Sequence, residues 1–128
     1  MKILILGAGQ VGSTLAKYLC SDDDNDITIV DQIADKLTPL QRYLDIKTVV
    51  GYGAYPSVLE KAGIKTMDMV IAVMGSDERN MVACRMAHTL YHVDTKIARI
   101  RTTEYLLRPE IFTNEALPID FLITPEIL

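Results

Sequence analysis

The strongest constraint on this chain is a glycine-rich turn between a predicted strand and a predicted helix near its N-terminus. Residues 3–6 are all apolar, which is typical of a short buried strand, and apolar side chains recur at helical spacing over residues 10–20. A G-x-G-x-x-G turn carries weight only in this strand–turn–helix setting. The turn has the sequence Gly7-Ala8-Gly9-Gln10-Val11-Gly12.

Each of the three glycines meets a separate steric demand of such a turn. Gly7 permits the tight turn, Gly9 lets a pyrophosphate approach the backbone, and Gly12 lets the helix pack closely on the strand. The first N–H groups of the helix have no acceptor inside it and lie at the positive end of the helix dipole. The segment therefore predicts an anion site at the start of this helix.

Strand and helix patterns alternate along the rest of the chain, which indicates βαβ units and a parallel sheet. We expect an α/β fold, a Rossmann-like doubly wound parallel sheet of about six strands with helices on both faces. Pro39 is expected to kink or split its helix, and Gly63 is expected to end the following one. The predicted strands are residues 3–6, 27–30, 47–50, 69–73, 96–101 and 121–123, and the predicted helices are 10–20, 34–44, 56–62 and 76–91.

Length and charge narrow the function classes. A chain of 128 residues fits a single domain, 1–128, and its last five residues are typical of the start of another helix, so we expect a part of a longer protein. The net charge of −4 argues against a nucleic-acid or membrane-surface binder. No apolar run approaches the length of a membrane span. Cys20 and Cys84 lie in helical patterns and are interpreted as free thiols of a reducing cytoplasm.

Asp31 ends the second predicted strand, 19 residues after Gly12, where a Rossmann domain places the carboxylate that binds ribose hydroxyls. An acid there repels a 2′-phosphate, and Gln32 and Ile33 supply no cation to offset it. NAD(H) or another unphosphorylated adenosine ribose is therefore favoured over NADP(H). The alternative is that Asp31 only caps the next helix.

Two further segments follow strands and should reach the same edge of the sheet, because ligands of open α/β folds bind at the carboxyl ends of strands. The glycines in Gly51-Tyr52-Gly53 would let an adenine approach, with Tyr52 covering it, although a plain turn explains the segment equally well. Val73 and Met74 leave the fourth strand toward the same crevice.

Arg99 and Arg101 lie two residues apart in the fifth predicted strand and hence on one face of it. A strand buried on both faces needs a partner for such cations. A phosphate would supply one for Arg99, and a salt bridge with Glu104 or another acid is the alternative.

The remaining patterns indicate neither a metal nor a catalytic site. Cys84, His88 and His92 recur every four residues over about 12 Å of helix, too far to share one ion, and are interpreted as a surface or interface stripe. The chain shows no acid–base pair suited to hydride transfer. A binding module is favoured, and a fragment of an NAD-dependent oxidoreductase is the alternative.

Taken together, these segments resemble the RCK (KTN) domain family, and within it the N-terminal domains of Trk-type potassium-uptake regulatory subunits. The likeness covers essentially the whole chain. It is carried by residues 1–12, 51–59, 62–64, 69–81, 96–101 and 117–120.

The resemblance implies a cytoplasmic regulatory subunit at the inner face of the membrane, partnered with a membrane-embedded potassium transporter and not itself inserted. It implies binding of NAD or NADH, or ATP or ADP at the same site, and self-association as a dimer or larger ring. The family often has Asp or Asn where this chain has Tyr52, so stacking on adenine would replace a hydrogen bond there. By motif, residues 7–11 would contact pyrophosphate, Asp31 the ribose, residues 51–53 the adenine, residues 73–74 the crevice wall and Arg99 a phosphate.

Overall fold

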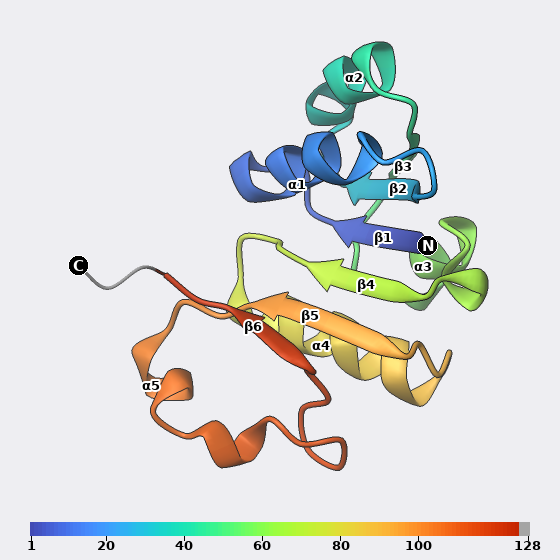
Figure 1. Ribbon diagram of the computed structural model, residues 1–128. Coiled ribbons are helices and arrows are strands. Elements are labelled where there is room, and N and C mark those ends of the chain that lie inside the picture. The colour runs from blue at the N-terminus through green and yellow to red at the C-terminus, as the bar shows by residue number, and fades with distance from the viewer. Residues whose placement is uncertain (126–128) are drawn as a thin grey trace.

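A single six-stranded sheet organises the molecule, and a computed structural model describes residues 1–125 of it. All neighbouring strands are parallel, in the order β3-β2-β1-β4-β5-β6, so the chain reverses its direction of travel across the sheet between β1 and β4 (Figure 1). The predicted doubly wound α/β fold is confirmed. The strands are β1 (Lys2–Leu6), β2 (Asp26–Asp31), β3 (Lys47–Val50), β4 (Met69–Ala72), β5 (Thr95–Arg99) and β6 (Phe121–Ile123).

The helices follow the predicted order with small changes at their ends. Pro39 neither splits nor ends α2, and Gly63 adopts the left-handed conformation (φ 84°) just after α3, as expected of a C-terminal glycine. The Ser76 side chain accepts a hydrogen bond from the Arg79 N–H and caps α4. The helices are α1 (Gln10–Cys20), α2 (Ala34–Tyr43), α3 (Pro56–Lys61), α4 (Asp77–Thr89) and α5 (Thr103–Leu106), with short 3-10 turns η1 (Ile64–Thr66) and η2 (Pro109–Ile111).

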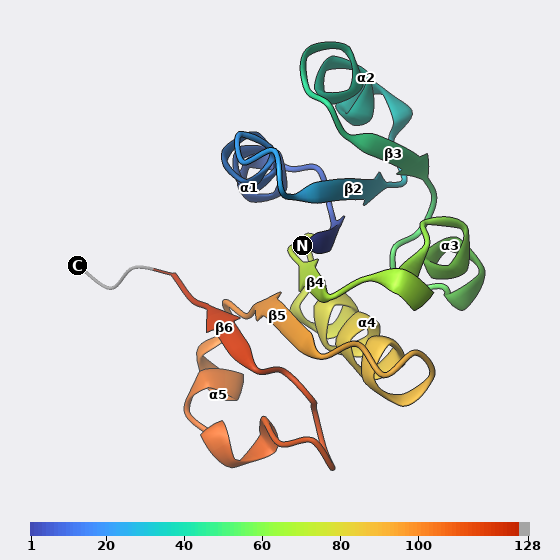
Figure 2. The ribbon, with the colours of Figure 1, turned by 45° about the vertical axis from the view of Figure 1, so that its right-hand side comes forward.

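Alternate side chains of the central strands pack into two separate cores. In β1, Ile3 and Ile5 face α1 and α2, whereas Leu4 and Leu6 face α3 and α4. All four are essentially inaccessible to solvent. Figure 2 shows the two helix layers on opposite faces of the sheet. Burial on both faces explains why these strands are continuous apolar runs in the sequence.

Strand β5 ends two residues earlier than expected, which corrects the placement of one arginine. The predicted strand ran over residues 96–101, but β5 ends at Arg99, so Arg101 lies in the loop beyond it. The cause is Asp77, whose carboxylate accepts the main-chain N–H groups of Arg101 and Thr102 at 2.7–3.1 Å. These N–H groups are thereby withdrawn from strand pairing.

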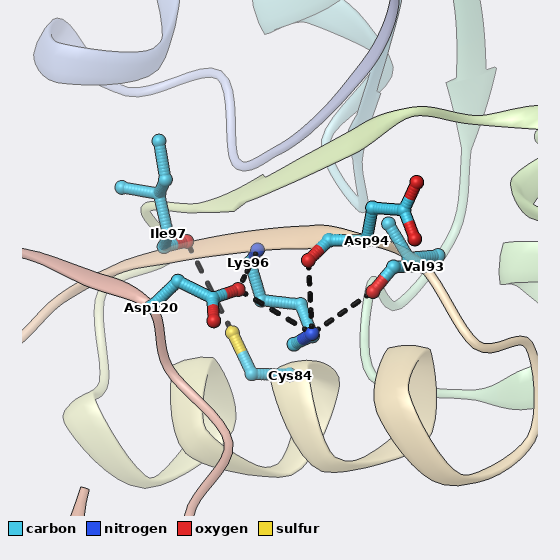
Figure 3. A network of polar contacts seen from close by, with 6 residues as sticks. All are labelled: Cys84, Val93, Asp94, Lys96, Ile97 and Asp120. Atoms are coloured by element: carbon cyan, nitrogen blue, oxygen red, sulfur yellow. Dashed lines mark hydrogen bonds and ion pairs between the residues drawn. The ribbon is translucent and has the colours of Figure 1, made fainter. Parts of the chain in front are cut away.

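An ion pair between the buried Lys96 and the partly exposed Asp120 joins β6 to β5. Lys96 Nζ lies 3.3 Å from Asp120 Oδ2 and donates hydrogen bonds to the carbonyl oxygens of Val93 and Asp94 (Figure 3). Asp120 Oδ2 also accepts the Lys96 N–H at 2.7 Å, and the Asp120 N–H donates to the Lys96 carbonyl at 2.8 Å. The residue before β6 is therefore joined to β5 through both main chain and side chain.

Cys84 lies beside this ion pair, on the face of α4 that packs against β5 (Figure 3). Cys84 is fully buried in the core, so the prediction of a surface or interface stripe of Cys84, His88 and His92 is wrong for Cys84. Cys20 is partly exposed, and neither thiol forms a disulfide within residues 1–125. Burial raises the pKa of Cys84 to about 12.

The helix predicted at the C-terminal end lies partly outside the residues that the structure describes. The helix predicted to start in the last five residues would include residues 126–128, which lie outside the described residues. Within residues 1–125, no helix combines the length and the apolar character needed to cross a membrane.

Candidate functional site

A cavity of about 270 Å³ opens at the carboxyl edge of the sheet, where the chain changes direction between β1 and β4. Loops that follow β1, β2, β3 and β4 form its walls, together with Arg99 at the end of β5. This is where ligands of open α/β sheets bind. The predicted site residues among its lining are Gly7, Gly9, Asp31, Gly51, Tyr52, Gly53, Val73, Met74 and Arg99.

The glycine turn has the steric character that its spacing predicted. Gly7 has φ of 111°, and a Cβ there would lie 2.7 Å from the Val73 carbonyl oxygen. A Cβ on Gly12 would lie 1.8 Å from the Gly7 carbonyl oxygen, which no side chain tolerates. A Cβ on Gly9 would meet no protein atom within 4 Å. Gly7 and Gly12 are therefore required by packing, whereas Gly9 borders open space in the cavity.

Some N–H groups of this turn donate to protein acceptors, and others have no acceptor within the helix. The Gly7 N–H donates to the Val30 carbonyl and the Ala8 N–H donates to Asp31 Oδ2, both at 2.8 Å. The N–H groups of the first turn of α1 have no acceptor within the helix, and Gly9 at the N-cap has no side chain to supply one. An anion at this helix start would accept from the first turn of α1 rather than from Gly7 or Ala8.

Four predicted residues of the turn lie behind or beside the cavity wall. Ala8 and Gly12 are buried, Val11 is partly buried, and Gln10 is exposed. Ala8 and Gln10 border a second, more apolar cavity of about 520 Å³ between α1 and α2. None of these four residues is among those that line the first cavity.

Asp31 ties the glycine turn to the end of β2. Its Oδ2 accepts the Ala8 N–H and its Oδ1 accepts the Ile33 N–H, each at 2.8 Å. The N-cap of α2 is Ile33, so the alternative in which Asp31 caps this helix is wrong. Each carboxylate oxygen keeps a lone pair that a ribose hydroxyl can use, because each accepts only one protein hydrogen bond here.

The turn after β3 is tightly built. A Cβ on Gly51 would lie 2.8 Å from Val58, and one on Gly53 would lie 3.0 Å from the Met74 sulfur. The Tyr52 ring packs against Tyr55, with ring centroids 4.5 Å apart, and the Arg79 guanidinium lies 5.0 Å from the Tyr52 centroid. Tyr52 thus already has two planar neighbours within the protein.

Arg99 reaches from β5 to the loop after β4. Its Nη2 donates to the carbonyl oxygens of Val73 and Met74, at 3.1 and 3.0 Å. Its Nε is buried and has no acceptor within residues 1–125. Burial and the nearby Arg101 hold the pKa of Arg99 below its ordinary value. Arg101 Nη2 donates to the Gly75 carbonyl, and the salt bridge with Glu104, which was the alternative to a phosphate, is absent from the described part of the chain.

Asn80 is a structural member of the site that the sequence pattern did not identify. It is fully buried in α4, accepts the Met74 N–H, and donates to the carbonyl oxygens of Met74 and Arg99. It therefore holds the loop after β4 against the end of β5. The available signal was the helical spacing of this amide with the apolar residues Cys84 and Ala87.

Two cations of the cavity wall were also missed. Lys36 comes from the first turn of α2 and lines the cavity together with Asp31, whereas only Gln32 and Ile33 were considered from the sequence as sources of a cation. Arg79 comes from the first turn of α4. The remaining lining residues outside the prediction are Val30, Gln32, Ile33 and Gly75. Residues 1–125 contain no group of three or more His, Cys, Asp or Glu side chains placed to hold a metal ion.

The chain is similar to bacterial potassium uptake proteins. It is 58% identical over 126 residues to the Trk system potassium uptake protein TrkA of Halomonas elongata, covering 98% of this chain and 27% of that protein. It is 53% identical over 127 residues to the protein of the same name from Haemophilus influenzae, covering 98% and 28%. The chain thus spans little more than a quarter of the length of these relatives.

Solved structures share the fold at lower identity. The TrkA-N domain of the inner membrane protein YbaL from Escherichia coli superposes with a TM-score of 0.81 at 16% identity, over 96% of this chain and 86% of that one. The NAD-bound GsuK channel superposes with a TM-score of 0.76 at 21% identity, over 95% of this chain and 21% of that one.

The model of the TrkA-N domain family matches residues 3–125, almost the whole chain. The family match, the close relatives and the parallel sheet with its glycine turn agree, and the chain belongs to the TrkA-N domain family.

Proposed function

We propose that this domain is the nucleotide-binding part of a cytoplasmic regulatory subunit that controls a membrane-embedded potassium transporter. The ligand would be NAD or NADH, or an adenine nucleotide such as ATP or ADP at the same site. Close relatives carry the name Trk system potassium uptake protein TrkA, and the GsuK channel of the same fold has been solved with NAD and with ADP.

The cavity wall carries groups suited to the pyrophosphate, the adenosine ribose and the adenine of such a ligand. The first turn of α1 offers N–H donors for the pyrophosphate, and Gly9 leaves room for its approach. Asp31 offers carboxylate lone pairs for a ribose. Gly51 and Gly53 would flank the adenine, Val73 and Met74 would line the crevice, and Arg99 would contact a phosphate.

The observation that carries the proposal is the unmatched Nε of Arg99. A buried donor without an acceptor costs free energy, so native proteins provide a partner for nearly all of them. Arg99 lines the cavity, and its charged guanidinium suits a phosphate oxygen. The residues present therefore fit a phosphate-bearing ligand.

A regulatory role is favoured over catalysis by the chemistry of the cavity wall. Its one carboxylate, Asp31, already accepts two main-chain hydrogen bonds, and its cations are Lys36, Arg79 and Arg99. This set suits the binding of an anion, and the cavity lining within residues 1–125 contains no histidine, cysteine or glutamate that could act as a second acid or base.

Control of transport would follow from unequal binding to two arrangements of an assembled dimer or ring. Only a ligand whose affinity differs between two arrangements can shift their balance. A tenfold difference supplies about 1.4 kcal/mol per site, and several sites in one assembly would add.

Isothermal titration calorimetry with NAD, NADH, ATP and ADP tests the proposal. Asp31→Ala should lower the affinity for every adenosine nucleotide by at least tenfold, because the ribose loses its acceptor. Asp45→Asn is the matched control, since Asp45 is exposed and lies outside the cavity. Failure of the unmodified protein to bind any of the four nucleotides would refute the proposal.

The regulatory step needs a separate measurement. The full-length protein should co-purify with a potassium transporter, and its assembly geometry, followed by small-angle scattering, should differ between two of the bound nucleotides. Identical scattering with all four would exclude regulation by unequal binding, and turnover of a nicotinamide substrate would favour an oxidoreductase instead.

A further inference from the structure

We propose that Arg79 selects nucleotides by their negative charge and that Tyr52 positions its guanidinium, an inference that rests on the proposed function. Arg79 lies in the first turn of α4, and its Cζ is 5.0 Å from the centroid of the Tyr52 ring. This distance is within the range of a cation–π contact. Both residues line the cavity.

The contact between Tyr52 and Arg79 joins two separate parts of the cavity lining. Tyr52 follows β3, at one edge of the sheet, and Arg79 follows β4, on the other side of β1. The loop that holds Tyr52 and the helix that holds Arg79 belong to opposite halves of the doubly wound fold. Tyr55 packs on the Tyr52 ring with centroids 4.5 Å apart and thereby fixes the ring. The Arg79 guanidinium is thus held at the cavity wall by an aromatic pair rather than by an acid.

The hydrogen-bond donors of Arg79 are uncommitted. Within residues 1–125, its guanidinium donates to no protein acceptor and forms no ion pair, whereas Arg99 and Arg101 each donate to main-chain carbonyls. The main-chain N–H of Arg79 donates to Ser76 Oγ, so its backbone is fixed by the cap of α4. A fixed backbone, a supported side chain and free donors suit an anionic ligand.

The cavity is electropositive although the chain is acidic. Three cations, Lys36, Arg79 and Arg99, and a single carboxylate, Asp31, line it in a protein of net charge −4. A cleft lined by one sign of charge concentrates ligands of the other sign. The benefit grows with the ligand's charge, so ATP and NADH gain more than NAD, whose nicotinamide cation offsets part of the pyrophosphate charge.

This assignment gives Tyr52 a different task from stacking on the base. One face of its ring lies beside Arg79, so removing the ring should act on the ligand through the arginine. Loss of either residue would then have nearly the same effect, and loss of both would add little. A direct stack of Tyr52 on adenine would instead give additive losses.

Calorimetry on Arg79→Gln, Tyr52→Ala and the double variant separates these cases, with ATP, NAD and adenosine as the probes. Arg79→Gln should lower the affinity for ATP about tenfold and the affinity for NAD by less than threefold, and should leave the affinity for adenosine unchanged. Tyr52→Ala should match Arg79→Gln, Tyr52→Phe should bind like the unmodified protein, and the double variant should lose no more than about twofold further.

Arg42→Gln is the matched control, because Arg42 is exposed on α2 and lies outside the cavity. Thermal unfolding of each variant verifies that it folds. Equal losses for ATP and adenosine in Arg79→Gln, or additive losses in the double variant, would overturn the inference while leaving the proposed function intact. If the unmodified protein bound none of the probes, the proposed function itself would fail.

Discussion

Two cations on β5, three residues apart, have opposite relations to their surroundings. The Lys96 side chain is only 4% exposed and faces α4, where two carbonyl oxygens and the Asp120 carboxylate surround its ammonium. Arg99 faces the other side of the strand and borders the cavity, and its buried Nε has no acceptor within residues 1–125. Protein oxygens surround the Lys96 ammonium, whereas the Arg99 guanidinium has a donor without a protein acceptor within residues 1–125.

This difference separates a structural charge from a binding charge more clearly than burial does. Lys96 is the more buried of the two, yet three protein oxygens lie within 3.4 Å of its ammonium nitrogen. A buried charge that is fully paired gives specificity to the fold, whereas an incompletely paired one has capacity left for a ligand. The comparison predicts opposite effects of mutation on stability and on binding.

The largest effect on stability is expected from Asp120→Ala. This change leaves the Lys96 ammonium buried without its counter-charge and also removes the acceptor of the Lys96 N–H. Unfolding in urea should show a loss of about 3 kcal/mol. The affinity of the folded fraction for ATP should stay within twofold of the original, and a larger change would show that the two cations are coupled.

Arg99→Met should have the converse effect. It removes the guanidinium that is proposed to contact phosphate, so calorimetry should show about a 30-fold weaker affinity for ATP, or about 2 kcal/mol. The unliganded protein should lose less than about 1 kcal/mol in urea, because the unmatched Nε disappears with the charge. A loss of stability as large as that of Asp120→Ala would make Arg99 a structural residue.

Asp77, at the start of α4, is a buried acid that binds the main chain just after β5, and its charge, like that of Lys96, is hydrogen-bonded to protein atoms. Burial alone raises the pKa of Asp77, but hydrogen bonds from Thr102 and Arg101 outweigh it and hold the pKa below the ordinary 3.8. Because the pKa of Asp77 is lower in the folded state than in the unfolded state, its ionised carboxylate stabilises the fold at pH values above 3.8. This stabilisation is lost as the pH falls below 3.8 and passes through the pKa of the folded state. Between pH 5 and pH 2, the urea midpoint should therefore fall less for Asp77→Asn than for the unmodified protein. At pH 7 the free energy of unfolding of Asp77→Asn should be lower by about 1 kcal/mol.

The smallest effect is expected from Lys96→Met, the partner change to Asp120→Ala. Replacing the buried ammonium with an apolar side chain removes its desolvation cost, and Asp120, 31% exposed, can be solvated by water. The free energy of unfolding should change by less than about 1 kcal/mol in either direction. If Lys96→Met cost as much as Asp120→Ala, the asymmetry between the two partners would be wrong.

The sequence was sufficient for the features that depend on local spacing. Strand patterns located all six strands, and the spacing of the glycine motif identified Gly7 and Gly12. The sequence did not show that the close approach at Gly7 is to Val73, which follows β4. The end of β5 was misplaced because Asp77, more than twenty residues earlier, binds its main chain.

The missed residues share one cause, which is contact between elements that are distant in sequence. Lys36 and Arg79 reach the cavity from the first turns of helices, and Asn80 joins two strand ends. Their positions depend on how each helix is rotated against the sheet. Periodicity indicates which face of a helix is apolar, but it does not indicate which polar residue at the rim turns toward the crevice.

Because Cys84 is buried, the rate at which a thiol reagent labels it can report how often α4 separates transiently from β5. With a pKa of about 12, its thiol is almost entirely protonated at neutral pH and cannot attack a disulfide or maleimide reagent while α4 stays packed on β5. Its labelling rate therefore measures how often that layer separates, with the partly exposed Cys20 as an internal reference for reagent quality. A nucleotide that tightens the crevice should slow the modification of Cys84 and leave that of Cys20 unchanged.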